Sequence, residues 1–363
     1  MSRYAKITDN IDWGLICTTF AIIFIGLACL YSSAGVTNPP IFYKQIIWII
    51  IGTLVMAVVF IIDYRVLMYS AWPLYLFVII TLLLVLMFGR EISGARRWIS
   101  LGPMGIQPSE LAKITVIIWM GYWGENKKHI QGYGIRELIV PAFFILIPIV
   151  FILAEPDLGT AGIVAFIALV MFLLLGIKRS TLIVLSMLFI SVMPFAWMSL
   201  KEYQRLRILS FFDPSRDPLG SGYHAMQSKI AVGSGGFAGK GFLEGTQTQL
   251  RFLPEHHTDF IFSVVAEEWG FMGSTFLIVL YLILITKIIS MGTKAKDRFG
   301  SMLCFGIAGY FTLHIFINIA MAIGIFPVVG VPLPFISYGG SFMLMNLICI
   351  GIILNISWRR FIF

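Results

Sequence analysis

The chain has 363 residues, of which 59% are hydrophobic and only 12% are charged, and its formal net charge is +8 at pH 7. Soluble globular domains carry about 25% charged residues. The composition therefore excludes an ordinary soluble enzyme and indicates an integral membrane protein. The basic excess lies mainly in the connections between apolar segments, so nucleic acid is a poor candidate for a partner.

A bilayer core needs about 20 apolar residues per helix, and the chain supplies about ten such runs in order. The first run is too long for the core of a signal peptide and predicts a retained span. Several runs are short or closely spaced, so nine or eleven spans also fit the pattern. The predicted fold class is an all-α integral membrane protein, with residues 1–363 forming a single polytopic membrane domain. The predicted spans are about 12–32, 45–62, 67–88, 108–124, 138–154, 158–177, 180–200, 260–289, 302–325 and 338–358.

Lysine and arginine residues predict the orientation of these spans. With the N-terminus inside, about fourteen of them fall in inner segments and about four in the short outer loops, when the long connection is left out of the count. The positive-inside rule then places both termini in the cytoplasm. It also makes residues 201–258 a large extracytoplasmic loop between the seventh and eighth helices.

Four connections carry unusual residues, and this orientation puts all four on the outer face. The third contains Gly94-Ala-Arg-Arg-Trp98 and continues to Gln107-Pro-Ser-Glu-Leu-Ala-Lys113. The fifth is the tight segment 155–160, and the seventh ends at Asp259. The ninth, residues 330–340, has many glycines and prolines and no charge. We therefore expect the activity at the outer surface.

Two groups of charged side chains, one at the start of the fourth predicted span and one in the third connection, have an ordinary and a functional interpretation. Glu110 and Lys113 are three residues apart, so they share one face of a helix. They could form a structural ion pair, or Lys113 could belong to an anion site in which Glu110 orients it. Arg96 and Arg97 beside Trp98 could simply anchor the chain at the headgroup level, where Arg and Trp are common.

The fifth and ninth connections also fit plain turn chemistry. Asp157 or Thr160 can cap the helix that follows Pro156. The glycines and prolines of residues 330–340 are the usual residues of an uncharged turn. Composition alone assigns neither connection a function.

The long loop contains two segments of interest. Residues 223–232 have helical spacing and predict a short helix on the membrane surface, with Gln227 close to Lys229. Residues 233–241 contain five glycines in about nine residues and end near Lys240. Such a run can bring backbone N–H groups close to a phosphate, or it can serve as a flexible hinge.

Asp259 stands where the long loop enters the eighth span. Asp259 or Thr258 could cap that helix, since either side chain can accept a backbone N–H. Glu255, His256 and His257 lie nearby but lack the spacing of metal ligands, so we expect no metal site there. The four cysteines all lie in apolar runs and predict neither disulfides nor a metal site.

Six motifs in this order closely resemble the SEDS family (shape, elongation, division and sporulation) of bacterial membrane proteins, over essentially the whole chain. The pattern around Asp213 and Asp217 and the segments 227–236 and 245–250 are similar to the rod-elongation branch rather than the division branch. The motifs are Gly94-Ala-Arg-Arg-Trp98, Gln107-Pro-Ser-Glu110 with Lys113, Pro156-Asp-Leu-Gly-Thr160, Gly222-Tyr with Gln227-Ser, Leu253 to Phe262, and Gly330 to Gly340.

The resemblance implies a peptidoglycan glycosyltransferase that uses lipid II as donor and acceptor. Asp259 matches the family's catalytic aspartate and would act as the base. The departing pyrophosphate would be stabilised by cationic side chains, and polar side chains would position the sugar or a cation. The cationic candidates are Arg97, Lys113, Lys229 and Lys240, and the polar candidates are Gln107, Glu110 and Gln227. A divalent cation at the pyrophosphate is compatible with this chemistry, although no motif calls for one.

The resemblance also implies a location and partners. The protein would lie in the bacterial cytoplasmic membrane and work with a class B penicillin-binding protein, a transpeptidase, and the elongation machinery. Two other classes remain open. Glu110, Lys113, Glu267, Glu268 and His314 within apolar runs would suit an ion-coupled transporter or a flippase of lipid-linked precursors, although no internal repeat is visible. A scaffold that activates a partner is the third alternative.

Overall fold

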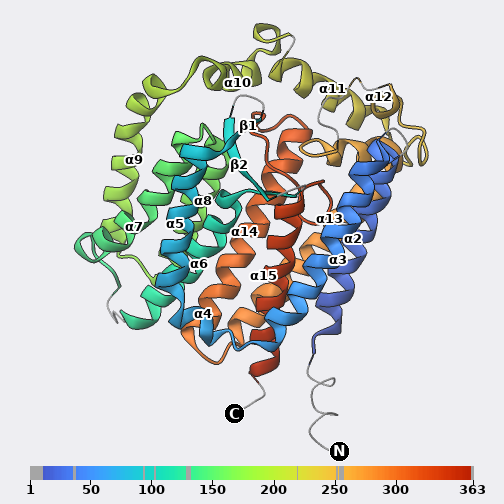
Figure 1. Cartoon of the computed structure of the whole chain (residues 1–363). Helices are drawn as coiled ribbons and strands as arrows, with labels where there is room; N and C mark the ends of the chain where they lie inside the picture. Colours follow the sequence, from blue (N-terminus) through green and yellow to red (C-terminus); the bar gives the residue numbers. More distant parts are fainter. Residues whose placement is uncertain are drawn as a thin grey trace, which may run out of the picture.

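The structure is a computed structural model that describes residues 11–35, 38–92, 95–101, 104–127, 132–218, 220–250, 252 and 257–360. The described part is almost entirely helical, and its long helices form one bundle (Figure 1). Nine of the helices in these ranges are long and apolar enough to cross a bilayer. The architecture is therefore the predicted one, a helical membrane protein. The helices are α2 (Trp13–Leu30), α3 (Pro39–Ile61), α4 (Arg65–Tyr69), α5 (Ala71–Phe88), α6 (Pro108–Asn126), α7 (Ile135–Ala154), α8 (Leu158–Leu175), α9 (Arg179–Ser199), α10 (Glu202–Phe212), α11 (Ser221–Ser234), α12 (Thr246–Gln249), α13 (Ile261–Thr293), α14 (Arg298–Ala322) and α15 (Gly340–Arg359).

The predicted span at 108–124, the fourth in chain order, is α6, which is helical but more polar than the nine others. Its 19 residues include Glu110, Lys113 and Glu125. The helix packs against α5, α8 and α14, and most of its residues are buried. Protein therefore replaces lipid around its charged side chains, which removes most of the cost of placing them at membrane depth.

A small antiparallel sheet connects α5 to α6, which the sequence pattern did not predict. It consists of β1 (Arg90–Ile92), β2 (Ala95–Leu101) and β3 (Met104–Ile106), in the order β1-β2-β3. Two of the strands have only three residues, which is too short for an alternating pattern to be recognised. The sheet lies at the same end of the bundle as α10, α11 and α12 (Figure 1). We call this end the loop end.

The long connection between α9 and α13 is helical at the loop end rather than an open loop. The predicted surface helix at residues 223–232 is present as α11. Helix α10, a 3-10 turn (Pro214–Arg216) and α12 also lie in the described part of the connection. Helix α13 changes direction at Gly270, where φ is 65° and ψ is −158°. A glycine is required there, because a Cβ atom would also lie 2.3 Å from the backbone nitrogen of Gly239.

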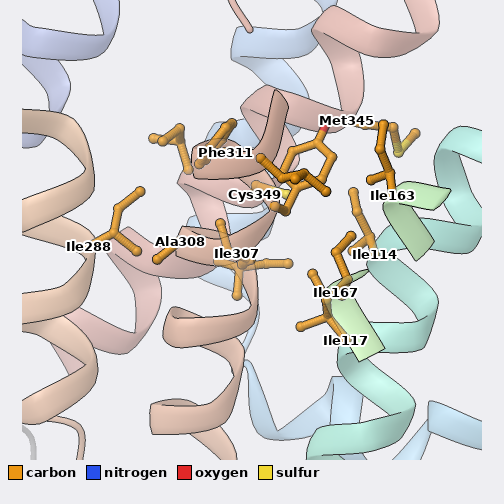
Figure 2. Packing of buried hydrophobic residues seen from close by; sticks show 14 of the residues in the cluster. Ile114, Ile117, Ile163, Ile167, Ile288, Ile307, Ala308, Phe311, Met345 and Cys349 are labelled. Carbon is orange, nitrogen blue, oxygen red and sulfur yellow. The ribbon is translucent and has the colours of Figure 1, made fainter. Parts of the chain in front are cut away.

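The core lies where α6, α8, α14 and α15 meet. Ile114 and Ile117 from α6 pack in one hydrophobic cluster with Ile163 and Ile167 from α8 and Ile307 from α14 (Figure 2). Most of α15 is buried, whereas nearly all of α9 is exposed. The buried centre of the bundle thus lies beneath the loop end in Figure 1, and α9 lies at the edge of the bundle.

Candidate active site

A cavity of about 540 Å³ lies at the loop end, and Asp259 is one of its lining residues. Its wall combines segments that are far apart in the sequence: the sheet, the start of α6, the turn before α8, α10 and the connection between α14 and α15. The predicted residues Arg97, Gln107 and Glu110 line the same cavity. The structure therefore brings four of the eight predicted site residues together.

A second cavity of about 360 Å³ adjoins the first at Asp259. Tyr203, Arg207 and Asp259 line both cavities. Tyr203 and Arg207 are four residues apart on α10, so they share one face of that helix. The sequence interpretation missed both. Their spacing was the available signal, but nothing in the sequence indicated that α10 lies over Asp259.

Asp259 precedes α13 without being its N-terminal cap. The capping position belongs to Phe260, and that residue supplies no side-chain hydrogen bond. The alternative in which Asp259 or Thr258 serves only as the helix cap is therefore not supported by this geometry. The carboxylate is partly exposed and lines the two cavities.

The uncharged connection between α14 and α15, together with Asn318 of α14, holds the backbone at Asp259 and at the two residues before it. Ser337 Oγ donates a hydrogen bond to the carbonyl of Thr258 at 2.6 Å, and the N–H of Tyr338 donates to the carbonyl of His257 at 2.9 Å. The buried amide of Asn318 donates to the carbonyls of Asp259 and Val331, each at 2.7 Å. These bonds fix the position of Asp259, and the sequence analysis missed Asn318 and Ser337 because their partners are distant in sequence.

Arg97 is bound to the turn between α7 and α8. Its guanidinium donates to the carbonyl of Pro156 at 2.8 Å and to that of Glu155 at 3.4 Å, and it lies 3.5 Å from a carboxylate oxygen of Asp157. Asp157 caps α8 as predicted, accepting from the N–H and the hydroxyl of Thr160, each at 3.0 Å. The positive charge of Arg97 is thus partly balanced within the protein.

Glu155 is fully buried in the same turn, and neither of its carboxyl oxygens has a hydrogen-bond partner among the described residues. Burial, followed by the negative charge of Asp157, raises the pKa of the Glu155 carboxyl to about 8, and Arg97 offsets part of this shift. Glu155 is therefore mostly protonated at neutral pH.

Lys113 lies behind the cavity rather than in its wall. Its ammonium group donates to Glu110 Oε1 at 2.7 Å and contacts His314 Nε2 at 3.2 Å, and only 1% of the side chain is exposed. His314 Nδ1 lies 3.2 Å from the carbonyl of Pro332. Lys113 therefore orients Glu110 and connects α6 to the segment that holds Asp259, instead of reaching a ligand in the cavity.

Lys240 and the glycine-rich residues 233–241 bind to other parts of the protein. The interpretation of this segment as a phosphate-binding loop did not predict these contacts. Lys240 Nζ donates to the buried Glu267 at 2.8 Å. Glu267 also accepts the N–H groups of Gln247 and Thr248 at the start of α12. The N–H groups of Lys240 and Gly241 bond to carbonyls of α13 next to its break. The run 233–241 is thus bound to α13 and lies outside the two cavities lined by Asp259.

The two remaining predicted residues on α11 also lie outside these cavities. Lys229 packs close to Gly324 and lines a neighbouring space of about 10 Å³. Gln227 is next to Ser228, and it is Ser228 that faces inward, where it bonds to Ser263 and to the carbonyl of Ala322. The spacing had predicted the helix correctly, but it could not predict which face α11 turns toward Asp259.

The described residues contain no group of three or more His, Cys, Asp or Glu side chains that could hold a metal ion. Glu255 and His256, whose spacing had argued against a metal site, lie outside the described residues, as do Gly94 and the side chain of Arg96.

Known proteins are similar to this chain in both sequence and fold. Peptidoglycan glycosyltransferase MrdB of Escherichia coli K12 is 38% identical over 97% of this chain and 94% of that protein. Peptidoglycan glycosyltransferase RodA of Treponema pallidum is 29% identical over 97% of this chain and 98% of that protein. A probable peptidoglycan glycosyltransferase FtsW of Geobacter sp. M18 is 36% identical over 95% of each.

Solved structures of related proteins also resemble this chain. One chain of a peptidoglycan synthase complex, described as coordinating polymerization and crosslinking, matches with a TM-score of 0.84 and 33% identity over 97% of this chain and 98% of that chain. The rod shape determining protein RodA of Thermus thermophilus matches with a TM-score of 0.73 and 28% identity over the same shares. The family described as "Cell cycle protein", which groups FtsW, RodA and SpoVE, matches residues 11–361. This chain belongs to the FtsW, RodA and SpoVE family.

Proposed function

We propose that this chain is a peptidoglycan glycosyltransferase that polymerises lipid II at the outer face of the bacterial cytoplasmic membrane, for cell elongation. The observation that carries the proposal is the position of Asp259, whose side chain lines two adjoining cavities at the loop end. A transferase that joins two substrates must hold both of them within reach of its base, so a base that borders two binding spaces suits this reaction. The curated names of the relatives support the reaction class.

The chemistry requires one base and one stabilised leaving group. A hydroxyl of the acceptor sugar attacks the anomeric carbon of the donor, and its proton passes to the Asp259 carboxylate. The bond from the anomeric carbon to the diphosphate oxygen breaks, and its electron pair leaves with the diphosphate. Direct displacement inverts the anomeric carbon and needs no covalent intermediate on the protein. The hydrogen bonds from Asn318 and Ser337 support this step by holding the base in place.

The residues that line the larger cavity form the proposed binding site. Gln107 and Glu110 are proposed to contact the lipid-linked sugar or its diphosphate, and Arg97 to shape the cavity wall by bracing the turn before α8. Lys113 is proposed to orient Glu110 from behind. Gln227, Lys229 and Lys240 lie outside both cavities and are not part of this site.

The setting fits a lipid-linked substrate. The polyprenyl tail would stay in the bilayer while the headgroup reaches the cavities at the loop end, which the positive-inside rule places on the outer face. A class B penicillin-binding protein is the proposed partner, together with the elongation machinery. The resemblance to a chain of a peptidoglycan synthase complex supports this assignment.

The decisive experiment compares wild type with Asp259→Asn in a lipid II polymerisation assay, with the cognate class B partner bound and moenomycin present. The variant keeps the shape of the side chain and removes its basicity. We expect polymer from wild type and at least about a 100-fold lower rate from the variant, the usual size of a general-base contribution. Asp213→Asn is the matched control, since Asp213 is on the same connection but lines neither cavity.

The other outcomes have distinct meanings. Equal polymer from wild type and Asp259→Asn would keep the transferase and remove Asp259 as its base. No polymer from wild type, with the partner bound, would contradict the proposed function and favour the flippase alternative, which a lipid II flipping assay would then address.

A further inference from the structure

Two guanidinium groups, those of Arg97 and Arg207, line the cavity of about 540 Å³. Arg97 is already committed, because it donates to the carbonyls of Glu155 and Pro156 and lies 3.5 Å from Asp157. A ligand anion would have to compete with these partners for the charge of Arg97. The side chain is suited to bracing the turn before α8, and less suited to receiving charge that develops during a reaction.

Arg207 lies in a different environment. Within the part of the chain that the structure describes, its guanidinium forms no ion pair with a carboxylate, and its closest recorded partner is the ring of Tyr203, at 5.9 Å. The side chain is exposed, and it lines both cavities that meet at Asp259. It also lines two neighbouring spaces of about 260 Å³ and 10 Å³.

A surface arginine at headgroup depth often has only an anchoring use, and α10 supplies an example for comparison. Arg205 donates to the carbonyls of Trp197 and Met198 at the end of α9, at 3.1 Å and 2.5 Å. Arg205 thus caps a helix and lines neither cavity. Arg207, two residues further, has no such use, so its position over the cavities calls for another explanation.

We propose that Arg207 binds the diphosphate of the lipid-linked donor and neutralises the charge that develops on it as it leaves. This inference rests on the proposed function. A guanidinium presents paired N–H donors that match two oxygens of a phosphate group. Because Arg207 borders both cavities at Asp259, its charge is available on the leaving-group side while Asp259 takes the proton of the acceptor hydroxyl.

The test uses the full chain bound to its cognate class B partner and compares Arg207→Ala and Arg207→Lys with wild type. Arg216→Ala is the matched control, because Arg216 pairs with Asp213 on the same connection and lines neither cavity. Two quantities are measured: kcat/KM for lipid II polymerisation, and the inhibition constant of added undecaprenyl diphosphate, with undecaprenyl monophosphate as the weaker comparison ligand.

We expect Arg207→Ala to lower kcat/KM by roughly 10- to 100-fold, the usual range for losing a hydrogen bond to a charged group. The inhibition constant of undecaprenyl diphosphate should rise by a similar factor. Arg207→Lys should be intermediate, since lysine keeps the charge without the paired donors. Arg216→Ala should match wild type in both measurements.

The inference is overturned if wild type polymerises lipid II and Arg207→Ala has the same kcat/KM and the same inhibition constant for undecaprenyl diphosphate as wild type. The proposed function would survive that result. It is also overturned if activity falls while diphosphate inhibition is unchanged. If Arg207→Ala does not melt cooperatively, Arg207→Gln replaces it with the same expected outcomes. Failure of wild type itself to polymerise would instead contradict the proposed function.

Discussion

Buried carboxyl groups at the loop end have different partners, and these partners determine what each group can do. Glu267 accepts from Lys240 and from two backbone N–H groups, which is the arrangement expected of an ionised carboxylate. Glu155 is equally buried, but its carboxyl oxygens have no partner among the described residues. Of these two equally buried glutamates, only Glu155 lacks described partners that would stabilise a negative charge on its carboxyl oxygens.

Glu155 predicts a specific dependence of stability on pH. The pKa of its carboxyl is about 8 in the folded protein, against an ordinary value near 4.5. Between these two values the folded state binds more protons than the unfolded state, so this group makes the free energy of unfolding fall as pH rises. The slope is at most about 1.4 kcal/mol per pH unit. Below pH 4.5 the contribution is fully present, and above pH 8 it is lost.

Glu155→Gln keeps the size of the side chain and cannot ionise, so this slope should disappear in the variant. The measurement is denaturant unfolding in detergent at pH 5, 6.5 and 8, for wild type and variant together. We expect the variant to gain stability over wild type as pH rises. A difference between the two proteins that stays constant across these pH values would show that Glu155 does not titrate in this range.

At the scale of elements, α13 links the site to the membrane part of the protein, and its direction changes at one glycine. The first part of α13 begins just after Asp259 and ends at Gly270. There the N–H groups of Phe271 and Met272 donate to the carbonyls of Gly236 and Phe237. The glycine run thus supplies the hydrogen-bond partners that α13 loses at its break, which explains why this segment has so many small residues.

Gly270→Ala should therefore destabilise the protein strongly. The φ of 65° disfavours any side chain by about 1–2 kcal/mol, and the added Cβ would lie 2.3 Å from the nitrogen of Gly239. We expect a loss of more than about 2 kcal/mol in the free energy of unfolding. Gly162→Ala in α8 is the control, because its Cβ meets no atom within 4 Å and alanine favours a helix. Equal melting temperatures for the two variants would contradict this account of the break.

Sequence reasoning succeeded for elements that a local residue pattern specifies. It failed for contacts between residues that are far apart in the sequence. The spans follow from the thickness of a bilayer, and α11 follows from spacing along one helix face. The Lys240–Glu267 pair joins residues 27 positions apart, and Asn318 reaches Asp259 across 59 positions. No periodicity reports such contacts. Arg207 was missed for the same reason, since only the folded chain brings α10 over Asp259.

The whole molecule is asymmetric along the axis of its bundle. The sheet, α10, α11, α12 and the cavities at Asp259 all lie at the loop end, whereas α2 begins and α15 ends at the opposite end (Figure 1). The opposite end has ion pairs of its own, Lys287 with Asp12 at 2.9 Å and Arg359 with Asp63 at 3.0 Å, but the cavities lined by Asp259 lie at the loop end. The positive-inside rule predicts that the opposite end, where both termini lie, faces the cytoplasm.

The predicted orientation can be tested with single cysteines and a maleimide that does not cross membranes. Ser215→Cys places an exposed thiol at the loop end, and Lys296→Cys places one in the short connection between α13 and α14 at the opposite end. Cys17 is replaced by serine in both, because it is the one exposed native cysteine among the four, all of which lie in the described residues. In intact spheroplasts we expect labelling of Ser215→Cys only, and after permeabilisation labelling of both. Labelling of Lys296→Cys alone in intact cells would invert the topology and place Asp259 on the cytoplasmic side, where an extracytoplasmic polymerase cannot have its base.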